Sequence, residues 1–102
     1  MDTDKLLDEI FEVSHTKAGK SLQEMVLKCV EEIGELAQAV LSFTGAEGCE
    51  YKELNREHVL EEIADVFLVD IAMAAKLNIT KEELKIEIAR KLKKWIEKTK
   101  NI

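Results

Sequence analysis

Residues 61–75 read EEIADVFLVDIAMAA, and this stretch decides the fold. Its first half carries acids at helical spacing, whereas its second half, from Val66 to Ala75, is apolar nearly all the way round a helical wheel. Only Asp70 interrupts that run, which is far shorter than the ~20 residues of a membrane span. A helix of this kind is covered on every side. In a chain of 102 residues the simplest cover is a second subunit, so we expect the protein to dimerise through this helix.

Two helices precede this stretch. Apolar residues at helical spacing predict a first helix over about 3–13, and residues 15–20 are expected to form a loop. Ser21 and Glu24 form a capping box, in which the hydroxyl and the carboxylate each accept a free backbone N–H. We therefore expect a second helix to begin directly after Ser21 and to stop near Gly45.

A fourth helix follows it. The third helix is expected to run from about residue 55 to residues 77–78, and a further capping box, Thr80 with Glu83, predicts the start of the next one. No strand pattern competes, so the fold class is all-α, with a four-helix bundle-like protomer and a single domain over residues 1–102. The expected inner stripe of the last helix consists of Leu84, Ile88, Leu92 and Trp95.

Composition narrows the function classes. The chain is 35% charged and 46% hydrophobic and has no Pro, which excludes collagen-like, low-complexity and broadly disordered proteins. Residues 1–80 hold 17 acids and 7 bases, a net charge of −10, whereas residues 81–102 hold 4 acids and 8 bases, a net charge of +4. The acidic body argues against nucleic-acid binding and favours an acidic centre for metal cations. With an acidic N-terminus and only two cysteines, we expect a cytoplasmic protein and no membrane association.

Two pairs of acids carry the functional signal. Glu32 and Glu35 lie three residues apart on the second helix, as do Glu62 and Asp65 on the third, so each pair shares one helix face. Both pairs begin where the helix enters the core, and antiparallel packing would bring them face to face. Four like charges at short range repel unless a cation lies between them. A ligand set of oxygen atoms alone favours Mg²⁺ or Mn²⁺. Carboxylates with such an ion are typical of enzymes that catalyse metal-assisted attack on a phosphoanhydride.

The residues also fit a simpler interpretation. Glu-rich helices are common, and solvated acids on a non-catalytic helical interaction module would show the same letters. In that case the apolar third helix would be only a dimer seam.

The two motifs resemble those of a known family. Glu31-Glu32-Ile33-Gly34-Glu35-Leu36, followed by Glu62-Ile63-Ala64-Asp65-Val66, resembles the E-E-x-x-E … E-x-x-D signature of MazG-like nucleotide pyrophosphohydrolases, in the all-α NTP pyrophosphatase superfamily. The resemblance runs from about Ser21 to the start of the last helix. It implies a homodimer or homotetramer and Mg²⁺-dependent hydrolysis of a nucleoside triphosphate, often a deoxynucleotide, to the monophosphate and pyrophosphate. Such an activity would suit the removal of unwanted nucleotides from the cellular pool.

The resemblance also implies roles for single residues. Carried over by position, the metal ligands are Glu32, Glu35, Glu62 and Asp65, with Mg²⁺ or Mn²⁺ as the ion. Glu31, the first acid of the motif, either supports the ligands or orients the attacking water, and we take it as the candidate catalytic residue.

The candidates for substrate binding are weaker. Many family members have a Lys followed by an Asn and an Arg in the last helix, and residues 90–95 read RKLKKW instead. Lys91 and Lys94 are candidates for phosphate contact, although a solvated helix face fits them equally well. His58 lies one turn before Glu62 and either contacts phosphate or base or simply caps the helix.

A second enzyme of the same superfamily, the phosphoribosyl-ATP pyrophosphohydrolase of histidine synthesis, shares the acid motifs. The Glu-Ile-Gly-Glu-Leu wording of residues 32–36 and the long loop before the third helix favour the MazG-like branch.

Overall fold

The computed structural model of the chain describes residues 2–16, 20–48 and 54–100. It contains four helices, α1 (Thr3–Thr16), α2 (Leu22–Phe43), α3 (Arg56–Lys76) and α4 (Lys81–Lys100), and no strand among the described residues. The predicted all-α, four-helix, bundle-like class is therefore confirmed.

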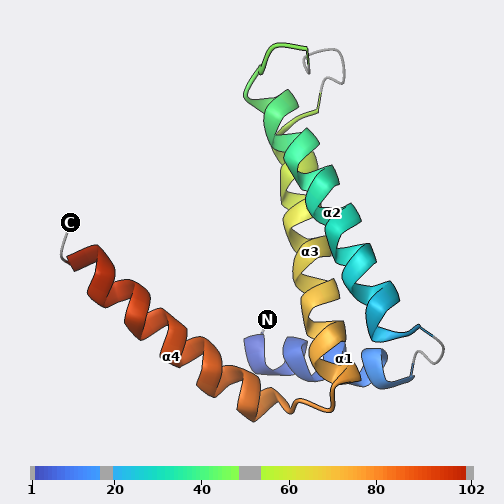
Figure 1. Cartoon of the computed structure of the whole chain (residues 1–102), viewed down its shortest axis with the longest axis vertical. Helices are drawn as coiled ribbons and strands as arrows, with labels where there is room; N and C mark the ends of the chain where they lie inside the picture. The colour runs from blue at the N-terminus through green and yellow to red at the C-terminus, as the bar shows by residue number, and fades with distance from the viewer. Residues whose placement is uncertain (1, 17–19, 49–53, 101–102) are drawn as a thin grey trace.

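Helices α2 and α3 run antiparallel, side by side, and form the body of the molecule (Figure 1). The capping box that begins α2 is present: the Glu24 backbone N–H donates to Ser21 Oγ at 3.1 Å, and the Ser21 N–H donates to Glu24 Oε1 at 3.2 Å. Gly45 follows the end of α2 with a φ of 73°, a left-handed conformation that glycine adopts without steric cost. Buried Ser42 accepts a hydrogen bond from the Leu54 N–H at 3.0 Å, which ties the start of the α3 segment to the end of α2.

Helix α1 crosses the lower end of this hairpin (Figure 1). Its Phe11 packs with Ile71, Ala74 and Ala75 of α3 in the one cluster of buried apolar side chains that the described residues form around α1. The predicted end of the first helix near residue 13 is wrong, because α1 continues through His15 to Thr16. In the added turn, Ser14 Oγ donates a hydrogen bond to the Ile10 carbonyl at 2.7 Å, so this serine lies within the helix and does not end it.

Helix α4 projects away from the other three (Figure 1). Its first turns are held to α1 by two ion pairs, Lys81 Nζ to Asp8 Oδ1 at 2.7 Å and Lys85 Nζ to Asp4 Oδ1 at 3.0 Å. None of its residues is buried, and Trp95 is 67% exposed. The prediction of an inner stripe is therefore wrong within one chain: only Leu84 packs against the core, whereas the rest of the stripe faces solvent.

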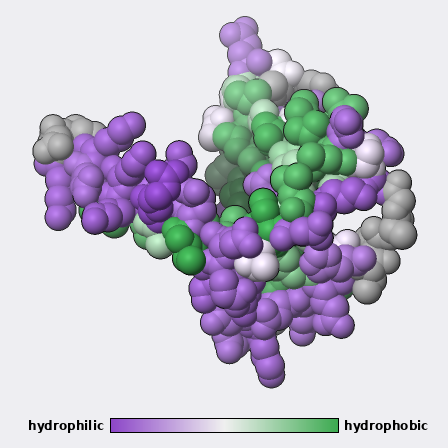
Figure 2. Space-filling view, turned by 60° about the horizontal axis from the view of Figure 1, so that its bottom comes forward, coloured by the Kyte–Doolittle hydropathy of each residue, from purple (hydrophilic) through white to green (hydrophobic). Residues whose placement is uncertain are grey.

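Much of the apolar surface of the α2–α3 body is also open. Leu27 on α2 is 68% exposed. Phe67 and Leu68 are each 46% exposed, so the second half of α3 is not covered on all sides within one chain. Figure 2 shows a hydrophobic area on the part of the molecule away from α4, beside the mainly hydrophilic arm that α4 forms. In the described part of the chain, no helix combines the length and hydrophobicity needed to cross a bilayer.

Candidate metal centre

Three carboxylates meet between α2 and α3. Glu32, Glu35 and Glu62 each offer an oxygen, and these oxygens all lie within 4.8 Å of one another. Two come from one turn of α2 and the third comes from α3, because antiparallel packing sets the acidic turns of the two helices opposite each other. We call this group the carboxylate cluster. The structure thus brings together three of the four ligands that the sequence predicts.

Burial makes the cluster costly without a cation. Glu32 is only 7% exposed and Glu62 is half-buried, whereas Glu35 is exposed. Among the described residues, Glu32 Oε2 and Glu62 Oε2 are buried side-chain oxygens that lack a hydrogen-bond partner. An orphaned buried acceptor loses its hydration and gains nothing in return. Both of these oxygens belong to residues of the carboxylate cluster, so a cation bound by the cluster would supply the partner that they lack.

The electrostatics of the cluster show the same strain. The pKa of Glu62 is raised above its ordinary value, first because burial removes water from the carboxylate and then because Glu35, Asp65 and Glu32 place negative charge nearby. Each of these causes favours the protonated form of the Glu62 side chain. A divalent cation would offset the repulsion directly, because its charge stabilises the ionised form of every carboxylate around it.

One side-chain cation already contacts the cluster. Lys28 Nζ lies 3.0 Å from Glu32 Oε1 and 3.3 Å from Glu31 Oε1. These two hydrogen bonds raise the pKa of the Lys28 ammonium above its ordinary value. Lys28 was not predicted from the sequence, since a lysine four residues before a glutamate is a common pattern on solvated helices and carries little functional signal.

The donor set fits a hard divalent ion. It consists of carboxylate oxygens alone, without sulfur or imidazole, which is the ligand chemistry that Mg²⁺ and Mn²⁺ prefer. Three carboxylates leave coordination positions open for water and phosphate oxygens. The residues present therefore fit the metal that the sequence motifs imply.

The remaining acids of the motifs lie beside the cluster. Asp65 is exposed, and its oxygens are not among those that lie within 4.8 Å of one another, although its charge contributes to the raised pKa of Glu62. Glu31 is exposed and reaches the cluster only through Lys28. Both residues are adjacent to the site without forming its centre.

The candidates for substrate binding are not part of the carboxylate cluster. His58 occupies the capping box of α3, where its N–H donates to Asn55 Oδ1 at 3.2 Å and its Nδ1 lies 2.8 Å from the same oxygen. Its place in the structure matches the capping alternative. Lys91 and Lys94 are exposed on α4, which packs mainly on α1 and not on the groove between α2 and α3.

Asp70, which interrupts the apolar run of α3, has a partner on α2. Its Oδ1 accepts a hydrogen bond from Cys29 Sγ at 3.4 Å, and the aspartate remains exposed. Cys29 itself is buried, and the pKa of its thiol is raised by burial first and by Asp70 second. A thiol of this kind is a poor nucleophile, so Cys29 belongs to the packing of the hairpin.

The chain matches a known protein family. The model of the MazG-like family matches residues 16–102, which include α2, α3 and α4 with the whole carboxylate cluster. No curated protein and no solved structure matches the chain.

The raised pKa of Glu62 predicts the pH dependence of stability in the metal-free protein. Because the folded chain binds this proton more tightly than the unfolded chain, the stabilising contribution is present below the ordinary pKa of 4.5 and is lost as the pH rises through the folded value. In EDTA at pH 7, Glu62→Gln should therefore raise the melting temperature, because the neutral amide avoids the cost of an ionised carboxylate at this position. The gain should shrink as the pH falls toward 4.5.

Circular dichroism melts of Glu62→Gln and of Glu61→Gln, an exposed neighbour on α3, provide the comparison. The control should melt like the wild type at each pH. Two results would contradict the electrostatic description of the cluster. One is a Glu62→Gln variant no more stable than the wild type at pH 7, and the other is an advantage over the wild type that grows as the pH falls.

Proposed function

Because the chain belongs to the MazG-like family, we propose that it is a Mg²⁺-dependent nucleoside triphosphate pyrophosphohydrolase. Its substrate would be a ribo- or deoxyribonucleoside triphosphate and its products the nucleoside monophosphate and pyrophosphate. Such an enzyme would serve to remove unwanted nucleotides from the cellular pool.

The observation that carries this proposal is the pair of orphaned carboxylate oxygens. Glu32 Oε2 and Glu62 Oε2 are buried without partners in a group of three carboxylates whose oxygens lie within 4.8 Å of one another. Acids that served only to solvate the helices would extend into water, where each oxygen is hydrated. The cluster instead has the burial and the donor set of a site for a divalent cation.

In this proposal, Glu32, Glu35 and Glu62 hold Mg²⁺, or Mn²⁺ in its place, and Asp65 completes the set from the next turn of α3. When bound there, the ion would supply positive charge to the phosphate oxygens and would lower the pKa of a coordinated water. Glu31 stands beside the ligands on the solvent side, where it orients the attacking water as a hydrogen-bond acceptor. The helical hairpin keeps these acids in place before substrate arrives, so little ordering is required during the reaction.

We also propose that the enzyme works as a homodimer, or as a homotetramer of two such dimers. The chain exposes 7945 Å², whereas a compact protein of 11.6 kDa is expected to expose about 5,800 Å², an excess of about 2,100 Å². The radius of gyration of 16.4 Å likewise exceeds the about 13 Å of a compact domain. A standard interface buries about 800 Å² per partner, so the excess is enough for an obligate dimer.

A second copy has a physical reason to cover these surfaces. Residues 1–80 carry a net charge of −10 and residues 81–102 a net charge of +4, so the basic α4 of one copy complements the acidic body of another. Lys91 and Lys94 do not approach the cluster of their own chain. As substrate-binding residues they would act on the phosphates bound by the other copy.

Removing a ligand should abolish catalysis without unfolding the chain. We expect Glu35→Ala and Asp65→Ala each to lower pyrophosphate release with Mg²⁺ by about 100-fold or more, because each loses part of the metal's coordination. The far-ultraviolet circular dichroism should stay unchanged, since both side chains are exposed. Glu61→Ala removes an equally exposed acid outside the cluster and should retain full activity.

The substrate panel should include the ribo- and deoxyribonucleoside triphosphates and phosphoribosyl-ATP. Full activity of both Glu35→Ala and Asp65→Ala would show that the carboxylate cluster takes no part in the reaction. Turnover of phosphoribosyl-ATP alone would assign the chain to the histidine-synthesis enzyme. A wild-type chain that hydrolyses none of these compounds, and whose melting temperature does not rise with Mg²⁺ and nucleotide, would be a helical interaction module.

The dimer is tested by mass in solution. Sedimentation equilibrium at micromolar concentration should give at least twice the 11.6 kDa of one chain. Phe67→Glu places a charge on the exposed apolar side of α3 and should shift the equilibrium toward monomer, whereas Ile86→Glu, 71% exposed on α4 and off its apolar stripe, should not. A monomeric wild type at these concentrations would contradict the proposal.

A further inference from the structure

Lys28 of α2 connects two acids that differ in burial. Its Nζ lies 3.0 Å from Glu32 Oε1 and 3.3 Å from Glu31 Oε1, so one ammonium is shared between two carboxylates. The Glu32 side chain is 9% exposed, whereas the Glu31 side chain is 58% exposed. Within the part of the chain that the structure describes, Lys28 is the one Lys or Arg that forms an ion pair with a member of the carboxylate cluster.

The ammonium of Lys28 offsets part of the negative charge of the cluster. A buried carboxylate without a positive partner is costly, and Lys28 supplies such a partner to Oε1 of Glu32. Oε2 of the same carboxylate is buried and has no hydrogen-bond partner. One ammonium does not balance three carboxylates, so the ion pair reduces the repulsion within the cluster without removing it.

A divalent ion and Lys28 would compete for Glu32. An ion bound by the cluster would share the Glu32 carboxylate with an ammonium that lies 3.0 Å from its Oε1. Two cations this close repel, and the buried side chain between them leaves little water to screen the repulsion. The doubly charged ion gains more from three carboxylates than the ammonium gains from one, so we expect the ion to take the place of Lys28.

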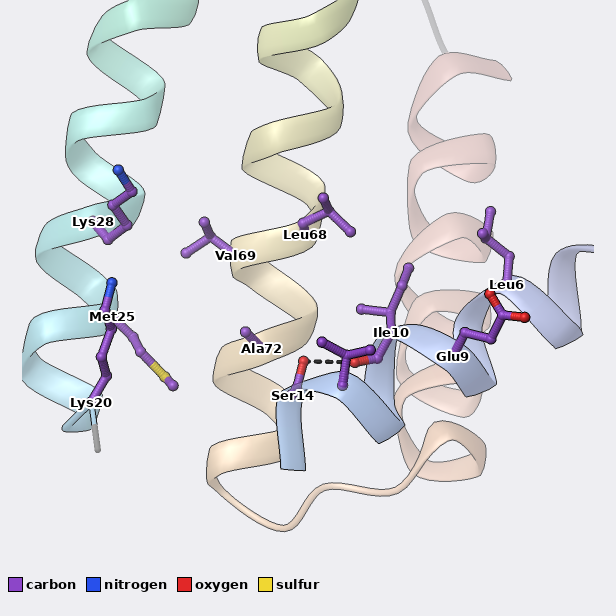
Figure 3. A pocket seen from close by; sticks show the side chains of 11 residues that line it. Leu6, Glu9, Ile10, Ser14, Lys20, Met25, Lys28, Leu68, Val69 and Ala72 are labelled. Carbon is purple, nitrogen blue, oxygen red and sulfur yellow. Dashed lines mark hydrogen bonds between the residues drawn. The ribbon is translucent and has the colours of Figure 1, made fainter. Parts of the chain in front are cut away.

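The Lys28 side chain has room to move and a second partner. It is 41% exposed, and it lines a cavity of about 590 Å³ between α1, α2 and α3, which gives its flexible stem space to turn (Figure 3). Glu31 lies outside the cluster and already contacts the same ammonium. Displacement from Glu32 therefore requires the rotation of one side chain, and the ammonium keeps a carboxylate partner.

We propose that Lys28 is the internal counter-cation of the metal-free cluster, and that a divalent ion binds by displacing it from Glu32 toward Glu31. Lys28 would thereby stabilise the metal-free chain and lower the affinity of the cluster for the ion. The inference rests on the metal site of the proposed function and adds to it a residue that sets the affinity of that site. It does not depend on which triphosphate the chain hydrolyses.

The substitution Lys28→Gln tests this competition, because it removes the charge and keeps a hydrogen-bond donor for Glu32. We expect two effects of opposite sign at pH 7. In EDTA the melting temperature, followed by circular dichroism, should fall because the cluster loses its counter-charge. In isothermal titration calorimetry the variant should bind Mn²⁺ about tenfold more tightly than the wild type, because no ammonium competes for Glu32.

Two further variants serve as controls. Lys5→Gln makes the same change of net charge at an exposed position of α1, and it should melt and bind Mn²⁺ like the wild type. Lys28→Arg keeps the positive charge beside Glu32 and should bind Mn²⁺ no more tightly than the wild type. If Lys28→Gln loses its helical circular dichroism in EDTA, saturating Mn²⁺ should restore it, and a variant that stays unfolded with Mn²⁺ would overturn the inference.

The sign of the change in Mn²⁺ affinity decides between the roles open to Lys28. Weaker Mn²⁺ binding by Lys28→Gln, together with a lower melting temperature, would show that Lys28 positions Glu32 for the ion, and would overturn the inference. Values equal to those of Lys5→Gln would make the ion pair a solvated contact on the helix surface, which overturns it as well.

The same measurements separate this inference from the proposed function. If Lys28→Gln binds Mn²⁺ more tightly but the wild type hydrolyses no triphosphate, the competition stands and the enzyme does not. If the wild type releases pyrophosphate with Mg²⁺ but Lys28→Gln binds Mn²⁺ like the wild type, the enzyme stands and the competition does not. If neither chain binds Mn²⁺, the metal site and this inference both fall.

Discussion

Repulsion among carboxylates at the contact between α2 and α3 is the constraint on which the rest of the structure depends. Packing of the two helices places Glu32, Glu35 and Glu62 together, and it buries one oxygen each of Glu32 and Glu62 without a partner. The raised pKa of Glu62 and the ion pair of Lys28 with Glu32 are two responses to this charge. Such a contact between α2 and α3 costs stability as long as no cation offsets the charge, which is what the proposed cation site would require.

The shape of the chain follows from its size. With 102 residues and one small cluster of buried apolar side chains around α1 and α3, a single copy leaves α4 without a packing partner for most of its length. The exposed area of the chain exceeds that of a compact monomer, and the net charge of α4 is opposite to that of residues 1–80. In the proposed dimer, the arm that α4 forms in one copy would cover the acidic surface of the other. Assembly and the proposed function would then depend on the same imbalance of charge.

Features within one helix turn could be predicted from the sequence, whereas contacts between helices could not. Ser21 and Glu24 lie within one turn, so their capping box could be recognised from sequence and is present in the structure. The apolar stripe of α4 was predicted to face the core of its own chain, and it does not. Helical spacing shows that a helix has an apolar face, but it does not show what covers that face. Helical spacing also predicted a group of four acids, whereas the oxygens of three of them, Glu32, Glu35 and Glu62, lie within 4.8 Å of one another. Spacing sets the helix face on which Asp65 lies, but it does not set where the carboxylate of Asp65 points. The pairing of Lys28 with Glu32 was not predicted, because a lysine four residues before a glutamate is common on solvated helices and the burial of Glu32 follows from tertiary packing.

The most direct test of this account is a crystal structure of the chain with Mn²⁺, whose anomalous scattering identifies the ion without ambiguity. We expect an anomalous peak bounded by carboxylate oxygens of Glu32, Glu35 and Glu62, at about 2.2 Å from each, with Asp65 turned toward it. Lys28 should then have left Glu32. Carboxylates that point apart, with no anomalous peak among them at saturating Mn²⁺, would contradict the central claim.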